Sequence, residues 1–430
     1  MRLPGRISAA IEILSEIEAH HRPAGDALRD WGNAHRFAGA GDRAAIGNLV
    51  YDALRRRAST AWLAGGDTPW HLAIGTVVRA GGIDPDDLNG AFADDARAPR
   101  AIPDDVAVRL RTADLSDADD AVRADLPDWA VPHFQAAFGD DWVREGEALA
   151  ERPPLDLRVN ALKADRAKVA RQLVHLGAEA APLSPVGLRI APMEGARRHP
   201  NVQAEEAYLR GRVEIQDAGS QLCALLLGAR PGEQVIDLCA GAGGKTLAIA
   251  AAMENRGQIY ATDRDKTRLA PIFDRLRRAG VRNVQVRSPT SAALDDLAGR
   301  MDRVIVDAPC SGSGAWRRRP DAKWRMGQGA LAQRLAEQRD VLAQAATLVR
   351  PGGLVEYVTC SVLPPENEQQ VSAFLKDHGD FELLSARDAW ARALPEVPSP
   401  AVACSESSLQ LTPARTQTDG FFVAWLMRRA

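Results

Sequence analysis

The chain has 430 residues, of which 46% are hydrophobic, and its formal net charge is −3. This length exceeds one ordinary domain, and no apolar stretch is long enough to span a bilayer or to act as a secretory signal. The 5 cysteines include no CxxC pair and no metal-ligand spacing with the histidines, so we expect a reduced, cytoplasmic protein without a disulfide framework or a metal.

Residues 1–130 are predicted to form a helical bundle. Ile7, Ala10, Leu14 and Ile17 share one helical face, and a second such pattern follows Asp42, which we expect to be a helix N-cap. Strand patterns are scarce, and the Asp-rich stretch 84–128 is expected to be loosely ordered. The pattern alone is equally compatible with a packing or dimerisation module.

Residues 131–213 are predicted to form a small α+β domain. Leu157 and Val159 alternate with polar neighbours, as in a short strand. Asp165 is placed to cap a helix that continues to Leu176. Proline and glycine between positions 182 and 195 indicate turns.

Residues 214–430 are predicted to form an α/β domain with a mostly parallel sheet. Short apolar runs are separated by helical patterns such as 266–279 and 331–349. Near-continuous apolar strands of this kind are typical of a parallel sheet that is covered on both faces. A final run, 420–426, is expected to add an edge strand. The apolar runs that predict the parallel strands are 235–238, 258–261, 284–286, 303–306 and 354–358.

A glycine-rich loop follows the first of these strands and precedes a helix. It matches neither of two common phosphate-binding patterns, because Thr246 stands where GxGxxG needs glycine and Cys239 stands where the P-loop needs glycine. A ligand without a pyrophosphate is therefore favoured, and S-adenosylmethionine is the common one. Asp263, at the end of the second strand, is placed to hold ribose hydroxyls, although it could simply cap the next helix.

Two cysteines follow neighbouring strands of the predicted sheet. Cys310 lies in the segment 307–314, DAPCSGSG, and Cys360 lies in the tripeptide TCS. Because the carboxyl ends of parallel strands line the binding crevice, both thiols are expected to face the cofactor. An isolated cysteine is more often a small buried hydrophobic residue, which suits Cys223 and Cys404.

A thiol in this position suits cytosine methylation. Carbon 5 of cytosine is a poor nucleophile until a thiolate adds to carbon 6 and shifts electron density onto it. An acid near ring nitrogen 3 assists this addition, and Asp307 is the candidate. A base or a second thiol must then help to release the product.

Several segments resemble one known family, the RsmB (Fmu/Sun) type of bacterial 16S ribosomal RNA cytosine-5 methyltransferases, within the wider NOL/NOP2/Sun group. The resemblance implies a Rossmann-like methyltransferase domain at 214–430, preceded by an RNA-side α+β domain and an N-terminal NusB-like RNA-binding bundle. It also implies Cys360 as the nucleophile, Cys310 as the residue of product release, and catalytic roles for Asp307 and Lys245. The segments that carry the resemblance are 216–221, 239–246, 307–314, 317–325, 359–361 and 418–422.

The same resemblance implies a set of residues that bind the cofactor. Ser288 occupies the place where the family carries an acidic residue against the adenine. The implied cofactor-binding positions are Cys239, Ala240, Gly241, Ala242, Gly243, Gly244, Lys245, Asp263, Ser288 and Asp307.

A basic segment with tryptophans is the candidate RNA contact, because arginines pair with phosphates and indoles stack on bases. A solvated loop with tryptophan anchors is the alternative. We expect a monomer that acts on 16S rRNA or a small-subunit precursor. A DNA cytosine-5 methyltransferase that uses Cys310 and a non-catalytic ribosome-assembly factor are the other hypotheses. The candidate RNA-binding residues are Arg317, Arg318, Arg319, Lys323, Trp324 and Arg325.

Overall fold

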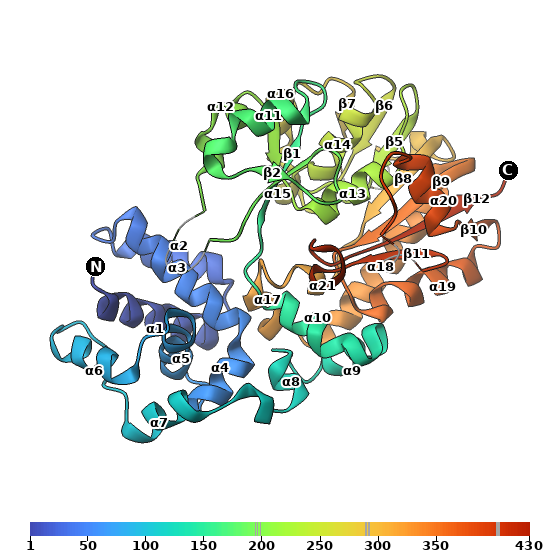
Figure 1. The fold of residues 1–430 in the computed structure, drawn as a ribbon. Coiled ribbons are helices and arrows are strands. Elements are labelled where there is room, and N and C mark those ends of the chain that lie inside the picture. The colour runs from blue at the N-terminus through green and yellow to red at the C-terminus, as the bar shows by residue number, and fades with distance from the viewer. Residues whose placement is uncertain (194, 196, 198, 289, 291–292, 401–404) are drawn as a thin grey trace. The chain divides into compact units, whose positions relative to one another are not determined.

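The computed structural model describes residues 1–193, 195, 197, 199–288, 290, 293–400 and 405–430. The chain divides into two compact units (Figure 1). The helical unit consists of Met1–Pro153, Pro192–His199 and Trp316–Gly327, and the α/β unit consists of Pro154–Ala191, Pro200–Ala315 and Gln328–Ala430. Within the described residues, no helix has both the length and the hydrophobicity needed to cross a membrane.

The helical unit is built around α1, α3 and α5. Ile7, Leu14, Ile46 and Ile74 are almost fully buried in its core, which confirms the helical face predicted for the N-terminal segment. The helices are α1 (Leu3–His20), α2 (Ala24–Ala34), α3 (Ala40–Arg55), α4 (Arg57–Ala64), α5 (Pro69–Gly81), α6 (Pro85–Ala93), α7 (Asp104–Thr112), α8 (Asp120–Arg123), α9 (Val131–Phe138), α10 (Trp142–Leu149) and α17 (Pro320–Arg325).

Two predictions for this unit are wrong. Asp42 is not an N-cap: α3 begins two residues earlier, after Gly39, and the Asp42 carboxylate instead pairs with the N-terminal ammonium group at 2.9 Å and with Arg6. The Asp-rich stretch is not loosely ordered, because several of its aspartates lie at the N-termini of helices. The Asp84 side chain accepts a hydrogen bond from the Asp86 N–H at 2.8 Å, which is the favoured role of aspartate at an N-cap.

A four-stranded antiparallel sheet, here called the small sheet, opens the α/β unit. Its strands are β1 (Leu155–Val159), β2 (Glu179–Ala180), β3 (Gly187–Ile190) and β4 (Val213–Ile215), in the order β2-β3-β1-β4. Asp165 caps α11 (Arg166–Gln172) by accepting from the Lys168 N–H at 2.8 Å, as predicted, but the helix ends at Gln172 and a separate 3-10 turn, Val174–Leu176, follows it. A further short helix of this region is α12 (Glu206–Leu209). The boundaries expected at residues 130 and 213 stay predictions, since the helical unit continues through α10 and the small sheet belongs to the same unit as the larger one.

The larger sheet has eight strands in the order β10-β12-β9-β8-β5-β6-β7, with β11 beside β12. β5 to β9 pair in parallel, which confirms the prediction. The final strand is not an edge strand, because β12 lies between β9 and both β10 and β11; its residues 421–426 are all buried, as an internal strand requires. The strands are β5 (Gln234–Asp237), β6 (Gln258–Ala261), β7 (Val284–Val286), β8 (Met301–Asp307), β9 (Val349–Thr359), β10 (Phe381–Leu383), β11 (Ser408–Leu411) and β12 (Phe421–Arg428).

Helices cover both faces of the larger sheet. Apolar residues of α13, α14 and α20 pack with Trp425 on one face, and those of α18 and α19 pack with Tyr357 and Phe422 on the other. The helix predicted over 266–279 is split into two at Pro271, because proline interrupts the helical hydrogen bonds. The helices are α13 (Ala218–Leu226), α14 (Gly244–Ala252), α15 (Lys266–Leu269), α16 (Ile272–Ala279), α18 (Gln328–Leu348), α19 (Glu368–Asp377), α20 (Ala386–Ala393) and α21 (Pro413–Thr416).

Candidate functional site

The glycine loop, residues 239–245, connects β5 to α14 at the carboxyl edge of the parallel strands. Gly241 and Gly243 have φ angles of +50° and +82°, which side chains other than glycine rarely adopt. A Cβ on Gly243 would also lie 2.5 Å from Cγ1 of Ile272. The N–H groups of the first turn of α14 have no acceptor within the helix. This edge therefore offers close backbone approach and hydrogen-bond donors to a ligand.

Asp263 connects the glycine loop to the end of β6. Its buried carboxylate accepts from the Gly241 N–H and from the Asp265 N–H, both at 2.8 Å. The cap of α15 is Asp265, whose side chain accepts from the Thr267 N–H, so Asp263 is not needed for that purpose. Contact between Asp263 and a ribose stays a prediction, as does the adenine contact of Ser288, which is exposed just after β7.

Asp237 ends β5 beneath the glycine loop. Its buried carboxyl group accepts a hydrogen bond from the Thr246 hydroxyl at 2.7 Å, and burial raises its pKa to about 7. Nearby, the Ala240 N–H donates to the Thr262 carbonyl at 2.9 Å, while burial raises the pKa of the Cys239 thiol. These contacts fix the base of the loop to β5 and β6.

Lys245 and Asp307 form an ion pair beside the loop. Nζ of Lys245 lies 2.6 Å from Oδ2 of Asp307 and 5.3 Å from the centre of the Phe421 ring. Burial lowers the pKa of Lys245, but the Asp307 carboxylate outweighs that effect and raises the pKa above its ordinary value. The lysine is therefore a cation. Its ammonium group contacts Oδ2 of Asp307 and not the other carboxylate oxygen.

The two cysteines predicted from the strand ends lie together. Sγ of Cys310 is 3.3 Å from Sγ of Cys360, and both residues are half-buried free thiols. The Gly314 N–H donates to the Cys360 carbonyl at 3.0 Å, which joins the two loops. The hydrogen bond to Cys360, together with burial, raises the pKa of Cys310. A protonated Cys310 can thus donate to the sulfur of Cys360. Cys223 is buried in α13, and Cys404 lies outside the described residues.

Comparison with known proteins identifies the family. Residues 224–427 match the family model "16S rRNA methyltransferase RsmB/F", and residues 126–193 match the ferredoxin-like domain of RsmF/B-like methyltransferases. A probable ribosomal RNA small subunit methyltransferase B from Synechocystis is 34% identical over 70% of this chain and 67% of its own length. The chain belongs to the RsmB/F family of methyltransferases. S-adenosylmethionine is its cofactor, and the glycine loop fits this ligand because its positive φ angles let the backbone approach closely.

Solved structures show that the resemblance extends beyond the catalytic domain of the RsmB/F family. The structure of PH0851 covers 99% of both chains with a TM-score of 0.72 and 25% identity. A methyltransferase homolog protein from Pyrococcus horikoshii covers 74% of this chain and 100% of its own, with a TM-score of 0.60 and 27% identity. The predicted combination of a Rossmann-like domain with a helical N-terminal region is thus confirmed.

A buried polar cluster behind the cysteines was not predicted from the sequence. Glu366 is fully buried, and Oε1 of its carboxylate accepts from the Ser311 N–H at 2.7 Å and from the Gln338 side chain at 3.1 Å. The Ser313 and Ser361 hydroxyls lie 2.9 Å apart. No local sequence pattern around the serines or Glu366 indicated that they would be in contact, because the partners are about fifty residues apart in the chain.

All six residues expected to bind RNA in this RsmB/F-family chain lie in the helical unit, and three of them are packed within it. Arg317 and Lys323 are only 4% and 2% exposed. Nζ of Lys323 donates to the Arg55 carbonyl at 2.9 Å, and the Trp324 indole donates to the Leu54 carbonyl at 2.6 Å. These contacts favour the alternative of a packed segment with tryptophan anchors and do not support RNA contact by these three side chains.

The remaining basic side chains of this segment are more accessible. Arg318 is half-buried, whereas Arg319 and Arg325 are exposed. Arg325 pairs with Asp321 at 2.9 Å. Arg319 and Arg325 therefore stay the candidates for RNA contact within the segment.

Proposed function

We propose that this chain methylates carbon 5 of a cytosine in 16S rRNA or in a small-subunit precursor, with Cys360 as the covalent nucleophile. The observation that carries this proposal is the distance of 3.3 Å between the sulfur atoms of Cys360 and Cys310. Two thiols at the ends of neighbouring strands suit a reaction in which one sulfur forms a bond with the base and the other helps to break it. The rRNA substrate is supported by the family model and by the name of the curated relative.

In the first step, Sγ of Cys360 bonds to carbon 6 of the cytosine. The electrons of the C5–C6 double bond move toward carbon 5, and the thiol proton is taken up at ring nitrogen 3. Asp307 accepts a hydrogen bond from that N–H, while Lys245 holds the carboxylate in position through their contact of 2.6 Å. When bound, S-adenosylmethionine would supply an electrophilic methyl group to the activated carbon 5, and the electron pair of the broken sulfur–methyl bond would remain on the sulfur of the thioether product.

Product release then reverses the addition. The proton on carbon 5 leaves to water, its bonding electrons restore the C5–C6 double bond, and the Sγ–C6 bond breaks with the electron pair on sulfur. Nitrogen 3 returns its proton. The Cys310 thiol, whose pKa is raised by its hydrogen bond to Cys360 and by burial, stays protonated and donates to the departing thiolate. Without this donor, the adduct should break down slowly.

Adduct trapping tests the proposal. We expect Cys310→Ala to accumulate a protein–RNA complex that survives denaturing electrophoresis, and the double variant with Cys360→Ala to form none. Cys223→Ala is a suitable control, because that thiol is buried in α13. Undiminished methyl transfer by Cys360→Ala would overturn the proposed mechanism.

Two other outcomes correspond to the alternative hypotheses. An adduct that requires Cys310 and forms on DNA that contains 5-fluorocytosine would indicate a DNA methyltransferase. Calorimetry that detects no binding of S-adenosylmethionine would indicate a non-catalytic assembly factor. Bisulfite sequencing of rRNA after the reaction would identify the methylated nucleotide.

A further inference from the structure

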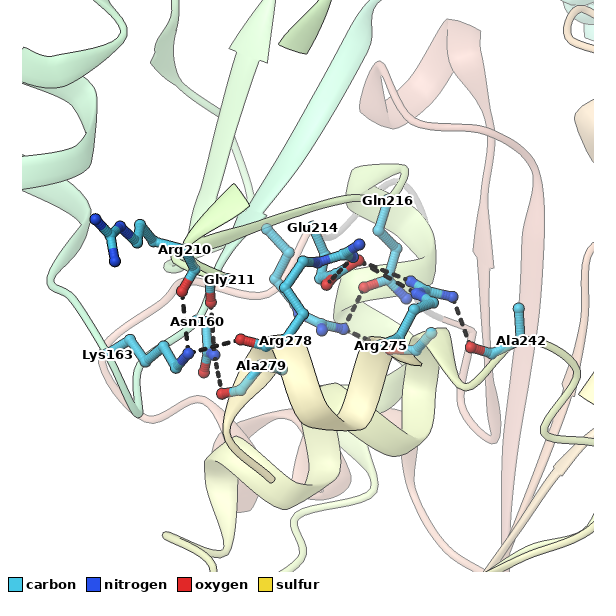
Figure 2. A network of polar contacts seen from close by, with 12 residues as sticks. Asn160, Lys163, Arg210, Gly211, Glu214, Gln216, Ala242, Arg275, Arg278 and Ala279 are labelled. Atoms are coloured by element: carbon cyan, nitrogen blue, oxygen red, sulfur yellow. Dashed lines mark hydrogen bonds and ion pairs between the residues drawn. The ribbon is translucent and has the colours of Figure 1, made fainter. Parts of the chain in front are cut away.

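A network of charged side chains joins the small sheet to the glycine loop (Figure 2). Arg158, on β1, is only 3% exposed. Its Nη1 donates to the Gly244 carbonyl at 2.5 Å and to the Gln216 side-chain oxygen at 2.5 Å. A strand of the small sheet therefore reaches Gly244, the residue at which the glycine loop enters α14.

A second arginine reaches the same loop from α16. Arg275 donates to the Ala242 carbonyl at 2.7 Å and pairs with Glu214, on β4, at 3.0 Å. Glu214 is 2% exposed and also pairs with Arg278. In Figure 2, the side chains of Arg275 and Arg278 converge on this one carboxylate. The small sheet thus supplies both a direct donor to the loop and the anion that orients the other donor.

Holding these carbonyls also orients the amides that follow them. A peptide group is planar, with its C=O and N–H on opposite sides. When Arg158 fixes the Gly244 carbonyl, the N–H of Lys245 is turned the other way. When Arg275 fixes the Ala242 carbonyl, the N–H of Gly243 is held in its hydrogen bond to the Ala240 carbonyl at 2.8 Å, which keeps the turn of the glycine loop in place. Lys245 is also the residue that pairs with Asp307. The network therefore helps to position the backbone of a residue that belongs to the site.

The chemistry of these contacts suits a positioning role. Bonds from a guanidinium to a carbonyl are charge-assisted and therefore stronger than bonds between neutral groups. Arg158 stays a cation at neutral pH, although burial lowers its pKa to about 10. Glycines at 241 and 243 make the loop intrinsically permissive in conformation. External contacts must then select the conformation that binds the ligand.

We propose that Arg158 and Arg275 are positioning residues for S-adenosylmethionine, and that the small sheet is thereby a working part of the cofactor site. The proposal requires only that the chain bind S-adenosylmethionine, and it does not depend on the cysteine chemistry. Alternatively, the polar contacts could serve only to hold the small sheet against the rest of the α/β unit, a role here called docking. The two roles can be tested separately, because some of these contacts are made to the glycine loop and others are not.

Lys163, an exposed residue, provides the control for docking. Its Nζ donates to the Arg210 carbonyl at 3.0 Å and to the Arg278 carbonyl at 2.6 Å. Like Arg158, it donates to two acceptors, and one of them, the Arg278 carbonyl, joins the region of the small sheet to α16. Neither of these acceptors lies in the glycine loop. Lys163→Met therefore removes docking contacts and leaves the loop contacts in place.

The experiment compares Arg158→Met, Arg275→Met and Lys163→Met in the full chain. Calorimetry without RNA should show the dissociation constant for S-adenosylmethionine raised at least tenfold by Arg158→Met and about threefold to tenfold by Arg275→Met, against less than twofold for Lys163→Met. In steady-state assays, the KM for S-adenosylmethionine should rise while the KM for RNA stays unchanged. Arg158→Lys, which keeps the charge, should restore part of the affinity.

Two results would overturn the proposal. Circular dichroism and thermal melting establish which variants are folded at the assay temperature. If the folded arginine variants bind S-adenosylmethionine within twofold of the wild type, or if Lys163→Met weakens binding equally, the contacts serve docking alone. If Arg158→Met does not fold, the more exposed Arg275 decides the question by the same criterion. If the wild type itself does not bind S-adenosylmethionine, the cofactor assignment is refuted instead.

Discussion

The carboxylate of Glu366 accepts hydrogen bonds from both the N–H and the hydroxyl of Ser311, the residue that follows Cys310. Glu366 comes six positions after Cys360 in the sequence, and its backbone carbonyl accepts from the Tyr357 hydroxyl at 2.7 Å. One buried side chain therefore connects the segments that carry the two thiols. The distance between the sulfur atoms depends on this connection as well as on the strands.

We expect Glu366→Gln to weaken both the structure and the reaction. The new amide is neutral, so the donors that now bind the carboxylate, from Ser311 and Gln338, lose their charged acceptor. Hydrogen bonds to a charged group contribute about 1.5–3 kcal/mol, more than those to a neutral one. Urea unfolding should show that loss, and single-turnover methylation should slow by roughly tenfold or more, because a small misplacement of reacting groups is costly. Normal turnover in a destabilised variant would show that Glu366 supports folding alone.

The pair of thiols should also respond to oxidation. With sulfur atoms 3.3 Å apart, diamide is expected to remove two electrons and two protons and to join Cys310 to Cys360, since bonded sulfurs lie at about 2.05 Å. Methylation should stop and should return after dithiothreitol. Peptide mapping would locate the bond. Cys310→Ala should lose this disulfide, so diamide should not prevent the variant from forming its RNA adduct, and a block of adduct formation that persists in that variant would contradict the explanation.

Lys245→Met tests the ion pair at the site. The variant leaves Asp307 without its partner, but the carboxylate is 31% exposed and water compensates for part of the loss. We expect unfolding free energy to fall by about 1–3 kcal/mol. In a double-mutant cycle with Asp307→Asn, the two effects should be less than additive, with a coupling of at least about 0.5 kcal/mol. Strict additivity would mean that the contact does not contribute to stability.

The sequence predicted those parts of the site that are encoded by a short run of consecutive residues. Each follows from a strand that ends in a loop: the glycine loop after β5, Asp307 at the end of β8, and Cys360 after β9. Because parallel strands align their carboxyl ends, three separate local patterns were enough to place these residues at one edge. No partner from elsewhere in the chain had to be known.

Residues whose role depends on a distant partner were not predictable in this way. Lys323 has the composition of an RNA contact, yet its ammonium group meets a carbonyl of Arg55, 268 positions away. Arg158 appeared only as part of a short strand, and its acceptor in the glycine loop is 86 positions away. In both cases the side chain is buried by packing between elements, and a single sequence does not show which elements meet.

The exposed arginines of the basic segment should contribute to RNA affinity. Arg319 and Arg325 are exposed, and each arginine–phosphate pair that is removed should reduce the slope of log affinity against log salt by about 1, which gives about 2 when both are replaced. Filter binding of 16S rRNA at several salt concentrations would measure this slope for the Arg319→Ala, Arg325→Ala double variant. Trp324→Phe, which loses its bond to the Leu54 carbonyl, should lower stability by about 1 kcal/mol and leave the slope unchanged. Weaker RNA binding by Trp324→Phe with the slope unchanged, together with a normal slope in the arginine variant, would assign RNA contact to the indole.

The buried amine of Lys323 should make stability rise with pH in the alkaline range. Burial lowers the pKa of Lys323 to about 8 from an ordinary value of 10.5. Between these two pH values the unfolded chain binds more protons than the folded chain, so deprotonation favours folding by up to about 1.4 kcal/mol per pH unit. Below pH 8 both states are protonated and the contribution is constant. The neutral amine keeps its donor to the Arg55 carbonyl. Urea unfolding from pH 7 to pH 10 should therefore show wild type gaining stability relative to Lys323→Met, and a constant difference between them would contradict the lowered pKa.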